Sequence, residues 1–268
     1  MSDPQPLPVA IRAHVHPGDV VALEGFTHLI PYAAGHEIIR QGITGLTLAR
    51  VTPDALYDQM IGMGVADRLI RSWGGNPDVG SLHRFRDAIE NGWPCPLTVE
   101  EHSHAGMAVR YAGTGLPAHT DTITPMTCLF TRKQLAAVPA LKLDVAIVHA
   151  QQVDRAGNVG IWGTSGVQKT AVLAAHRSIV TVEEQVARLD PRCSVVLPSW
   201  TVTAVCIEPR GAHPSCTMGY YERDNGFYAA WDAISRDRRR FQDWVSRHVF
   251  ETGSFAEHLA LLGDADTA

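Results

Sequence analysis

Short apolar runs that alternate with helix-like segments constrain the fold of this chain most strongly. The clearest run is Asp144–Ala150, which is almost continuously apolar, as expected for a strand covered on both faces. A shorter run, Val20–Leu23, begins directly after the turn residues His16–Asp19. Because a helical pattern follows most of these runs, the sequence predicts an α/β fold with an open, mostly parallel sheet flanked by helices.

The spacing of apolar and turn residues predicts the remaining elements. We expect helices at residues 32–41, 55–64, 81–90 and 168–176, and strands at residues 46–51, 68–73, 178–182 and 202–207. Asp54 is a predicted N-cap of the second helix. The pattern becomes helical beyond Gly211, and we expect a helical C-terminal extension from about residue 220 within one domain, residues 1–268. Residues 115–125 are expected to form a loop of that domain.

Charge and composition exclude several classes of function. The 23 Lys and Arg are outnumbered by 28 Asp and Glu, so nucleic acid is not an expected partner. No apolar run approaches the roughly 20 residues that a membrane helix needs, and we expect neither a membrane partner nor a secretion signal. The five cysteines are an odd number without C-x-x-C spacing, which favours reduced thiols and a cytoplasmic location.

Polar or glycine-rich segments follow four predicted strands. They are Glu24–His28, Ser72–Asn76, Glu100–His104 and His149–Gln152. Ligands of open α/β sheets bind at the carboxyl ends of the strands, so we expect a site there. The first two segments match neither G-x-G-x-x-G nor the phosphate-loop pattern, which argues against a nucleoside triphosphate or ordinary dinucleotide. On spacing alone, both are better interpreted as plain strand-to-helix turns.

The segment Glu100–His104 is the densest ionisable cluster. Carboxylates beside histidines can perform acid–base or nucleophilic chemistry. Ser103 can equally be the N-cap of a helix over residues 105–112. The pair His102 and His104 lacks a third ligand at a recognisable spacing, so we expect no metal site.

No convincing nucleophile motif is present. Glu90-Asn91-Gly92 resembles the Glu-Asn-Gly stretch of some acyl-transfer enzymes, but it closes a predicted helix, where Asn-Gly is ordinary C-cap chemistry. Nothing near Cys95 or Cys128 indicates a lowered thiol pKa, and we expect both to be packing residues. The G-x-S-x-G elbow of serine hydrolases is absent.

Several segments taken together are more specific than any single motif. They are Gly18–Val20, Gly25–Thr27, Pro31–Ala34, Arg40–Thr44, Leu46–Thr47, Asp144–Gln152, Gly157–Asn158, Ile161–Gly163, Gly211–Ser215, Gly219–Tyr221 and Asp224–Asn225. This set resembles the A (alpha) subunit of the family I CoA-transferases, most of all the glutaconate CoA-transferase branch. The resemblance extends from about Ile11 to Leu262, nearly the whole chain.

The resemblance implies a CoA-transferase (NagB/RpiA/CoA-transferase-like) fold and a heteromer with a second, B-type chain, A2B2 or larger. It further implies transfer of CoA between an acyl-CoA and a carboxylic acid, dicarboxylic or 3-oxo, through a glutamyl-CoA thioester on the B-type chain. Coenzyme A would thus be a substrate, with no permanently bound cofactor. Because this chain is acidic overall and shows no Lys and Arg cradle for the phosphates of CoA, we expect the partner to supply much of the binding of CoA.

On this resemblance the chain lacks the nucleophile and completes the pocket that holds the acid and orients the thioester carbonyl. The candidate substrate-binding residues are Gly25, Phe26, Thr27, Trp73, Gly74, Gly75, Asn76, Glu101, His102, Ser103, Gln151 and Gln152. Trp73, Trp93 and Trp162 are expected to be exposed aromatics. The segment from Leu116-Pro117 to Pro125 is shorter than in most relatives, which leaves the acid specificity open.

Two alternatives remain. The chain resembles more weakly the A subunits of hydrolases that cleave the ring of steroid-derived CoA thioesters with a glutamate. Counting back from Leu116-Pro117 without gaps places His102 at that position, and Glu101 fits only with a shift of one residue. A non-enzymatic subunit that binds an acyl-CoA or metabolite ranks last, because no helix-turn-helix or basic segment is present.

Overall fold

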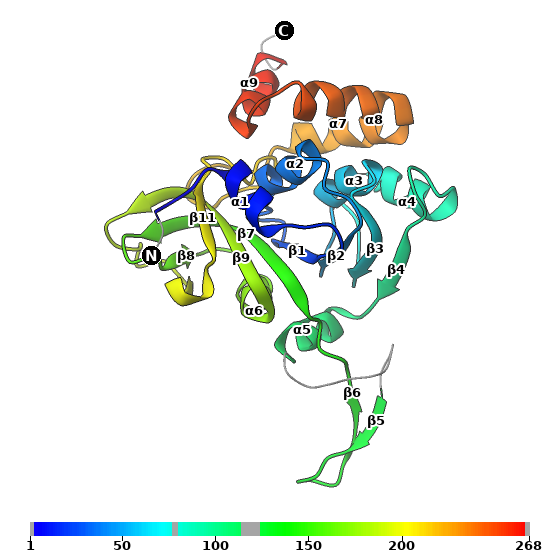
Figure 1. The fold of residues 1–268 in the computed structure, drawn as a ribbon, viewed down its shortest axis with the longest axis vertical. Coiled ribbons are helices and arrows are strands. Elements are labelled where there is room, and N and C mark those ends of the chain that lie inside the picture. The colour runs from blue at the N-terminus through cyan, green and yellow to red at the C-terminus, as the bar shows by residue number, and fades with distance from the viewer. Residues whose placement is uncertain (1–2, 77–79, 114–123, 266–268) are drawn as a thin grey trace.

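A parallel sheet forms the centre of the molecule (Figure 1). The computed structural model describes residues 3–76, 80–113 and 124–265. In the described residues, the parallel strands run in the order β11-β9-β7-β1-β2-β3-β4, and β8 and β10 add antiparallel pairs. The strands are β1 Val20–Glu24, β2 Leu46–Arg50, β3 Ala66–Arg71, β4 Thr98–Glu101, β7 Leu143–Asp154, β8 Val159–Ile161, β9 Ala175–Val186, β10 Val195–Leu197 and β11 Ala204–Ile207. The prediction of an open, mostly parallel sheet is confirmed.

Two central strands are longer than the sequence predicted. β7 continues past Ala150 to Asp154, and β9 begins at Ala175, inside the helix expected at residues 168–176. The first half of β7 pairs with β1 along one edge. Beyond Ala150 this edge pairs instead with β8, an antiparallel strand that follows the turn at Gly157. The polar pair Gln151 and Gln152 therefore belongs to the strand and not to a loop after it.

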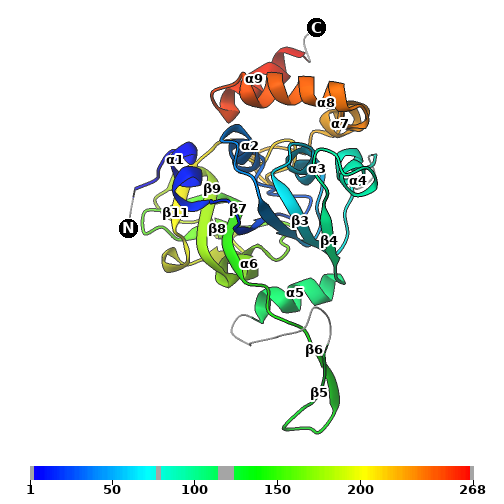
Figure 2. The same cartoon turned by 45° about the vertical axis from the view of Figure 1, so that its right-hand side comes forward.

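Helices cover both faces of the sheet (Figures 1 and 2). They are α1 Leu7–His14, α2 Tyr32–Arg40, α3 Ala55–Gly62, α4 His83–Glu90, α5 His104–Ala112, α6 Gln168–Ala174, α7 Asn225–Arg236, α8 Arg238–Val245 and α9 Phe255–Ala265, with single turns η1 Ser199–Thr201 and η2 Ser246–Phe250. One apolar core joins the sheet to α1–α4 and the C-terminal helices, and a second joins it to α5 and α6. None of the described helices is long and apolar enough to cross a bilayer.

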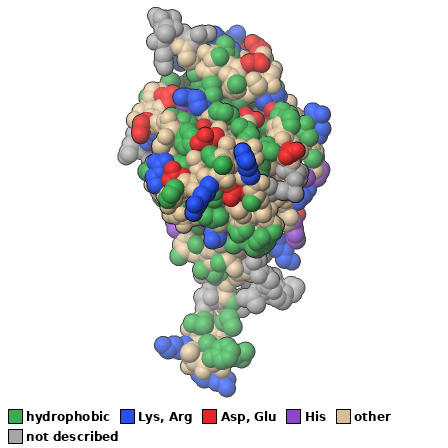
Figure 3. Space-filling view, turned by 90° about the vertical axis from the view of Figure 1, so that its left-hand side faces the viewer, with side chains coloured by type: hydrophobic (Ala, Val, Ile, Leu, Met, Phe, Trp, Pro, Cys, Tyr) green, Lys and Arg blue, Asp and Glu red, His purple; other side chains and the backbone are tan. Residues whose placement is uncertain are grey.

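An antiparallel hairpin projects from the body below α5 (Figures 1 and 3). It consists of β5 Thr124–Thr127 and β6 Gln134–Ala137, which pair only with each other among the described residues. Its turn exposes Leu129 by 75% and Phe130 by 94%. The sequence pattern contained no signal for this hairpin. The expected loop at residues 115–125 lies mostly outside the described residues, as does the shortened segment from residue 117 onward.

The C-terminal helices pack outside α2–α4 and begin at Asn225, close to the expected position. Trp231 of α7 is fully buried, stacks on Phe227 and contacts Phe241 and Trp244 edge-on. Its indole N–H donates to the carboxylate of Asp58 in α3 at 3.1 Å. These aromatic residues therefore attach the helical extension to the α/β body.

Three histidines meet where this extension contacts α2. The ring of His258 in α9 lies 4.8 Å from that of His36 and 5.4 Å from that of His248, centroid to centroid. Trp244 stacks on His248 at 4.7 Å. Burial lowers the pKa of His36 to about 3 and also lowers the pKa of His258 and of His248. All three imidazoles are thus expected to be neutral at pH 7 in the folded protein.

We expect His258→Phe to stabilise the protein relative to wild type only at acid pH. A folded pKa below the ordinary 6.5 means that the unfolded chain binds the extra proton, so this stability is complete above pH 6.5 and is lost as the pH falls. The variant should therefore gain about 1.4 kcal/mol per pH unit relative to wild type between pH 5.5 and 4.5. Urea unfolding of both proteins at pH 7.5, 5.5 and 4.5 measures this difference.

The free energies of unfolding of variant and wild type must be compared at each pH, because buried acids make the stability depend on pH in the opposite direction. Burial raises the pKa of Glu24, Asp58 and Glu208 to about 7, so their contribution weakens as the pH rises toward 7. These acids are common to both proteins and cancel in the difference. A difference that is constant from pH 7.5 to 4.5 would show that His258 is not buried neutral.

Candidate functional site

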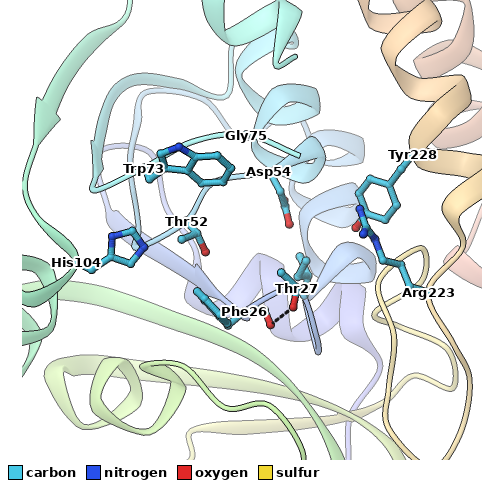
Figure 4. Close-up of a pocket in the computed structure, with 10 residues that line it drawn as sticks. Phe26, Thr27, Thr52, Asp54, Trp73, Gly75, His104, Arg223 and Tyr228 are labelled. Atoms are coloured by element: carbon cyan, nitrogen blue, oxygen red, sulfur yellow. Dashed lines mark hydrogen bonds between the residues drawn. The ribbon is translucent and has the colours of Figure 1, made fainter. Parts of the chain in front are cut away.

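A pocket lies at the carboxyl ends of β1, β2 and β3 (Figure 4). It has an empty volume of about 550 Å³, part of which is open to solvent. Its lining residues are Phe26, Thr27, Ile30, Thr52, Asp54, Trp73, Gly75, His104, Arg223 and Tyr228. Since this is the edge at which open α/β sheets bind ligands, the pocket is the candidate active site.

The loop after β1 forms one wall and depends on Gly25. A Cβ added to Gly25 would lie 2.6 Å from the carbonyl oxygen of Leu29 and 2.8 Å from the Cα of Ile30. Only glycine permits this close return of the backbone. Thr27 has a positive φ of 54°, and its hydroxyl donates to the carbonyl of Phe26 at 2.7 Å. The loop therefore holds Phe26 and Thr27 at the pocket in one unusual conformation.

His28 fixes the far end of the same loop. Its Nδ1 lies 3.0 Å from the carbonyl of Thr164, and its Nε2 accepts the backbone N–H of Met218 at 2.9 Å. These partners require a neutral ring with the proton on Nδ1. Burial lowers the pKa of His28, which agrees with that state. His28 is thus a structural residue behind the wall.

A buried ion pair supports the floor of the pocket. Arg50, at the end of β2, donates to both carboxylate oxygens of Asp54 at 3.0 and 3.1 Å and to the carbonyl of Gly25 at 2.9 Å. Asp54 also accepts the N–H of Leu56, so it caps α3 as the sequence predicted. Arg50 is fully buried and Asp54 is 5% exposed. The charge of Asp54 is therefore balanced within the protein.

Glu24 lies behind this floor. Its carboxylate accepts the hydroxyl of Tyr111 in α5 at 2.7 Å and the N–H of Val51 at 3.1 Å. Burial raises the pKa of Glu24 to about 7. Glu24 does not line the pocket, and its contacts join β1, the end of β2 and α5.

The opposite wall of the pocket is formed by the loop after β3 and by the first residue of α5. The N–H of Trp73 donates to Val51 and that of Gly75 to Pro53, which ties this loop to the loop after β2. His104 is the first residue of α5, and its Nδ1 lies 3.2 Å from the hydroxyl of Ser72. In Figure 4 the rings of Trp73 and Phe26 lie on opposite sides of the cavity. The pocket is therefore bounded by two aromatic rings.

The segment that leads into α7 closes the third side. The Arg223 guanidinium lies 4.2 Å from the ring centroid of Tyr228. The Tyr228 hydroxyl is 3.3 Å from that of Tyr32 in α2. The C-terminal extension thus contributes two side chains to the pocket, and no local sequence pattern pointed to them.

The structure brings together four predicted site residues, Phe26, Thr27, Trp73 and Gly75, in the pocket lining. Gly25 shapes the loop beneath them. Gly74 and Asn76 line a second, more open hollow beside Trp73. Asn76 is 5% exposed, and neither polar atom of its side chain has a hydrogen-bond partner in the described part of the chain. Thr52 and Asp54 were missed as lining residues, although they follow a predicted strand as the others do.

The cluster at residues 100–104 is mainly an ion-pair network. Glu101 pairs with Arg71, and its side chain is 61% exposed. His102 lies 2.7 Å from Glu100, which also pairs with Arg110. Ser103 accepts the N–H of Gly106 as the N-cap of α5, the structural alternative that the sequence offered. Glu101, His102 and Ser103 do not line the pocket, although the next residue in the chain, His104, does.

Gln151 and Gln152 are placed away from the pocket, within β7. Gln151 is fully buried and exchanges hydrogen bonds with the backbone of Trp162 at 2.9 and 3.3 Å. Gln152 bonds to Glu184 and to the N–H of Asp190. Trp162 is only 3% exposed, so the expectation that it is an exposed aromatic was wrong.

Other candidate groups lie outside the pocket. Hydrogen bonds from Thr131 lower the pKa of the Cys128 thiol, which corrects the sequence-based expectation, but this thiol lies on the projecting hairpin. Burial raises the pKa of Cys95. Over residues 3–76, 80–113 and 124–265, no group of three or more His, Cys, Asp or Glu side chains could hold a metal ion.

Comparisons with known proteins agree with this fold. The family described as Coenzyme A transferase matches residues 6–208. The chain is 53% identical to the A subunit of 3-oxoadipate CoA-transferase from Pseudomonas knackmussii over 95% of this chain and 96% of that one. It is 34% identical to the A subunit of glutaconate CoA-transferase from Acidaminococcus fermentans over 98% and 92%, respectively. The crystal structure of that enzyme superimposes with a TM-score of 0.88 at 32% identity, covering 98% of this chain and 93% of the other.

A weaker similarity corresponds to the hydrolase alternative. The cholesterol ring-cleaving hydrolase IpdA subunit of Rhodococcus jostii is 28% identical over 121 residues, which cover 43% of this chain and 41% of that subunit. The similarity to the CoA-transferase subunits is both higher and more than twice as extensive. The fold class and the resemblance inferred from sequence are confirmed.

Proposed function

Since the chain belongs to the coenzyme A transferase family, we propose that it is the A subunit of a heteromeric enzyme that moves CoA between an acyl-CoA and a dicarboxylic or 3-oxo acid. The observation that carries this proposal is the pocket of Figure 4, whose walls are built from the loops at residues 25–27 and 73–75. The relative at 53% identity is named for 3-oxoadipate, an acid that is both dicarboxylic and 3-oxo. We further propose a cytoplasmic A2B2 or larger assembly without a permanently bound cofactor.

The proposed reaction uses a glutamate of the B-type partner chain as the nucleophile. Its carboxylate attacks the thioester carbonyl of the donor, which gives a mixed anhydride and releases CoA thiolate. The thiolate attacks the glutamyl carbonyl of the anhydride, which frees the donor acid and leaves a glutamyl-CoA thioester. The acceptor carboxylate then repeats both steps in the opposite sense. This gives the new acyl-CoA and regenerates the glutamate carboxylate of the partner chain.

The described residues of the pocket fit a chain that lacks this nucleophile. Asp54 is the carboxylate in the lining, and Arg50 and the N-terminus of α3 hold both of its oxygens. Loops 25–27 and 73–75 would instead position the acid, with Phe26 and Trp73 enclosing its carbon chain. CoA would be held mainly by the B-type partner chain.

The second candidate is the ring-cleaving hydrolase, in which Glu101 would activate water. The side chain of Glu101 is accessible, because it is 61% exposed. Its pairing with Arg71 and its position outside the pocket lining favour the transferase.

We expect acceptor-dependent conversion when this chain is copurified with its B-type partner chain. Mass spectrometry would follow a panel of acyl-CoA donors with and without added dicarboxylic or 3-oxo acids. A new acyl-CoA that forms only with an acceptor supports the transferase, and the chain alone should be inactive. Loss of a cyclic acyl-CoA with addition of water, and without an acceptor, would favour the hydrolase.

The Glu101→Gln variant separates the two candidates further. The transferase should retain acceptor-dependent turnover in this variant, because another chain supplies the nucleophile. The hydrolase should lose all turnover while the heteromer still assembles, as size-exclusion chromatography would show.

A further inference from the structure

We propose that His104 binds the pantetheine arm of the acyl-CoA, by accepting the N–H of the amide that lies nearest to the thioester. This inference rests on the proposed function and extends it to the way in which this chain holds CoA. His104 lines the pocket, and Figure 4 shows its imidazole reaching toward the cavity that Trp73 and Phe26 bound. Nε2, the ring nitrogen farther from the backbone, is therefore on the cavity side.

The hydrogen bonds of Ser72 determine which ring nitrogen of His104 carries the proton. The hydroxyl of Ser72 donates its single proton to the carbonyl of Val51 at 2.5 Å. In its contact with Nδ1 of His104, at 3.2 Å, the ring must therefore donate and the hydroxyl accept. A neutral imidazole has one ring proton, so Nε2 keeps a free lone pair. Within residues 3–76, 80–113 and 124–265, no hydrogen bond occupies this nitrogen.

The position of His104 at the start of α5 suits a neutral ring. His104 is the first residue of this helix, where the aligned peptide dipoles disfavour a positive charge. Ser103 caps the same helix by accepting the N–H of Gly106 at 3.0 Å, so the backbone that carries the ring is also held. The wall of the pocket therefore presents a hydrogen-bond acceptor in a fixed place.

The acyl-CoA is the substrate that offers a donor to this acceptor. An ionised dicarboxylic or 3-oxo acid in its keto form has only acceptor oxygens. The thioester group also lacks a donor, but the pantetheine arm carries an amide N–H two methylene groups from the sulfur. Asp54, the carboxylate of the lining, is already bonded to Arg50 and to the N–H of Leu56. The amide N–H therefore pairs with His104 when the thioester carbonyl lies in the pocket.

The test compares CoA with an analogue in which oxygen replaces this one N–H, so that the amide becomes an ester. Calorimetry on the wild-type heteromer at pH 8.0 should show tighter binding of CoA by on the order of 10-fold, because the analogue replaces a hydrogen bond with a contact between two acceptors. His104→Phe should remove this preference. His104→Gln should restore part of it, because the side-chain oxygen of glutamine is also an acceptor.

Two further variants serve as controls. Ser72→Ala allows the ring proton to lie on either nitrogen, so it should reduce the preference for CoA without removing it. His176→Phe makes the same replacement at an exposed position near the start of β9, at the end of the sheet opposite to the pocket. This variant should bind both ligands as wild type does.

Equal affinity of the wild-type heteromer for CoA and the analogue, or a preference that persists in His104→Phe, would overturn the role of His104. Transfer assays with the corresponding acyl-CoA donors test the proposed function separately. The preference seen in binding should reappear in kcat/KM for the donor and be lost in His104→Phe. Binding of CoA that depends on His104 without any transfer would contradict the proposed function and leave this contact standing.

Discussion

Replacing Asp54 by alanine is expected to destabilise the protein by about 3–5 kcal/mol. The variant leaves the fully buried guanidinium of Arg50 without its carboxylate partner and removes the side-chain cap of α3. An uncompensated buried charge accounts for most of this loss, and a lost cap accounts for about 1 kcal/mol. Urea unfolding at pH 7.5, followed by circular dichroism, measures the free energy of unfolding.

The double variant Arg50→Met, Asp54→Leu separates the ion pair from other effects. Since buried pairs replaced by apolar residues of similar volume often lose little stability, the double variant should be more stable than Asp54→Ala. Arg50 also donates to the carbonyl of Gly25, so the double variant should still weaken the pocket loop. Equal destabilisation by the single and double variants would show that Arg50 is not stranded when Asp54 is removed.

The sheet could be predicted from sequence because its signals are local. The apolar run at Asp144–Ala150 predicts a strand, and the turn residues at Asp154–Asn158 predict a turn, each from its own local sequence. The extension of β7 through Gln151 and Gln152 could not be predicted in this way. Their amides are satisfied by Trp162, Glu184 and Asp190, contacts that exist only in the folded chain. The polar side chains of Gln151 and Gln152 therefore predicted a loop, although both residues lie in a strand.

The site was predictable to the extent that topology determines it. Phe26, Thr27, Trp73 and Gly75 follow strands, and parallel strands bring such residues to one edge. Thr52 and Asp54 also follow a strand, so the same rule could have predicted them as lining residues. Arg223 and Tyr228 obey no such rule, because they reach the pocket through the packing of α7 on α2 and α3. The dense cluster at Glu100–His104 was the strongest local signal, but most of its charges are used in ion pairs.

Gly25→Ala is expected to lower kcat/KM of the proposed transferase by on the order of 100-fold while the protein remains folded. The new Cβ would lie 2.6 Å from the Leu29 oxygen and 2.8 Å from the Ile30 Cα. Both contacts are with backbone, so the loop must move as a whole, and it carries Phe26 and Thr27. Overpacking of this kind costs about 1–3 kcal/mol of stability. Steady-state kinetics of the heteromer and urea unfolding measure the two effects.

Gly263→Ala provides the matched control for this substitution. Gly263 lies in α9, and, apart from its chain neighbours and the backbone of its own helix, no atom of the described residues is within 4 Å of the position that a Cβ would take. The same added methyl group should leave kcat/KM unchanged and stabilise the helix by about 0.5–1 kcal/mol, because alanine has the higher helix propensity. Wild-type activity in Gly25→Ala would mean that the backbone between residues 25 and 30 can move without displacing the pocket wall. The close approach at Gly25 would then serve the packing of the sheet edge and not the positioning of the acid.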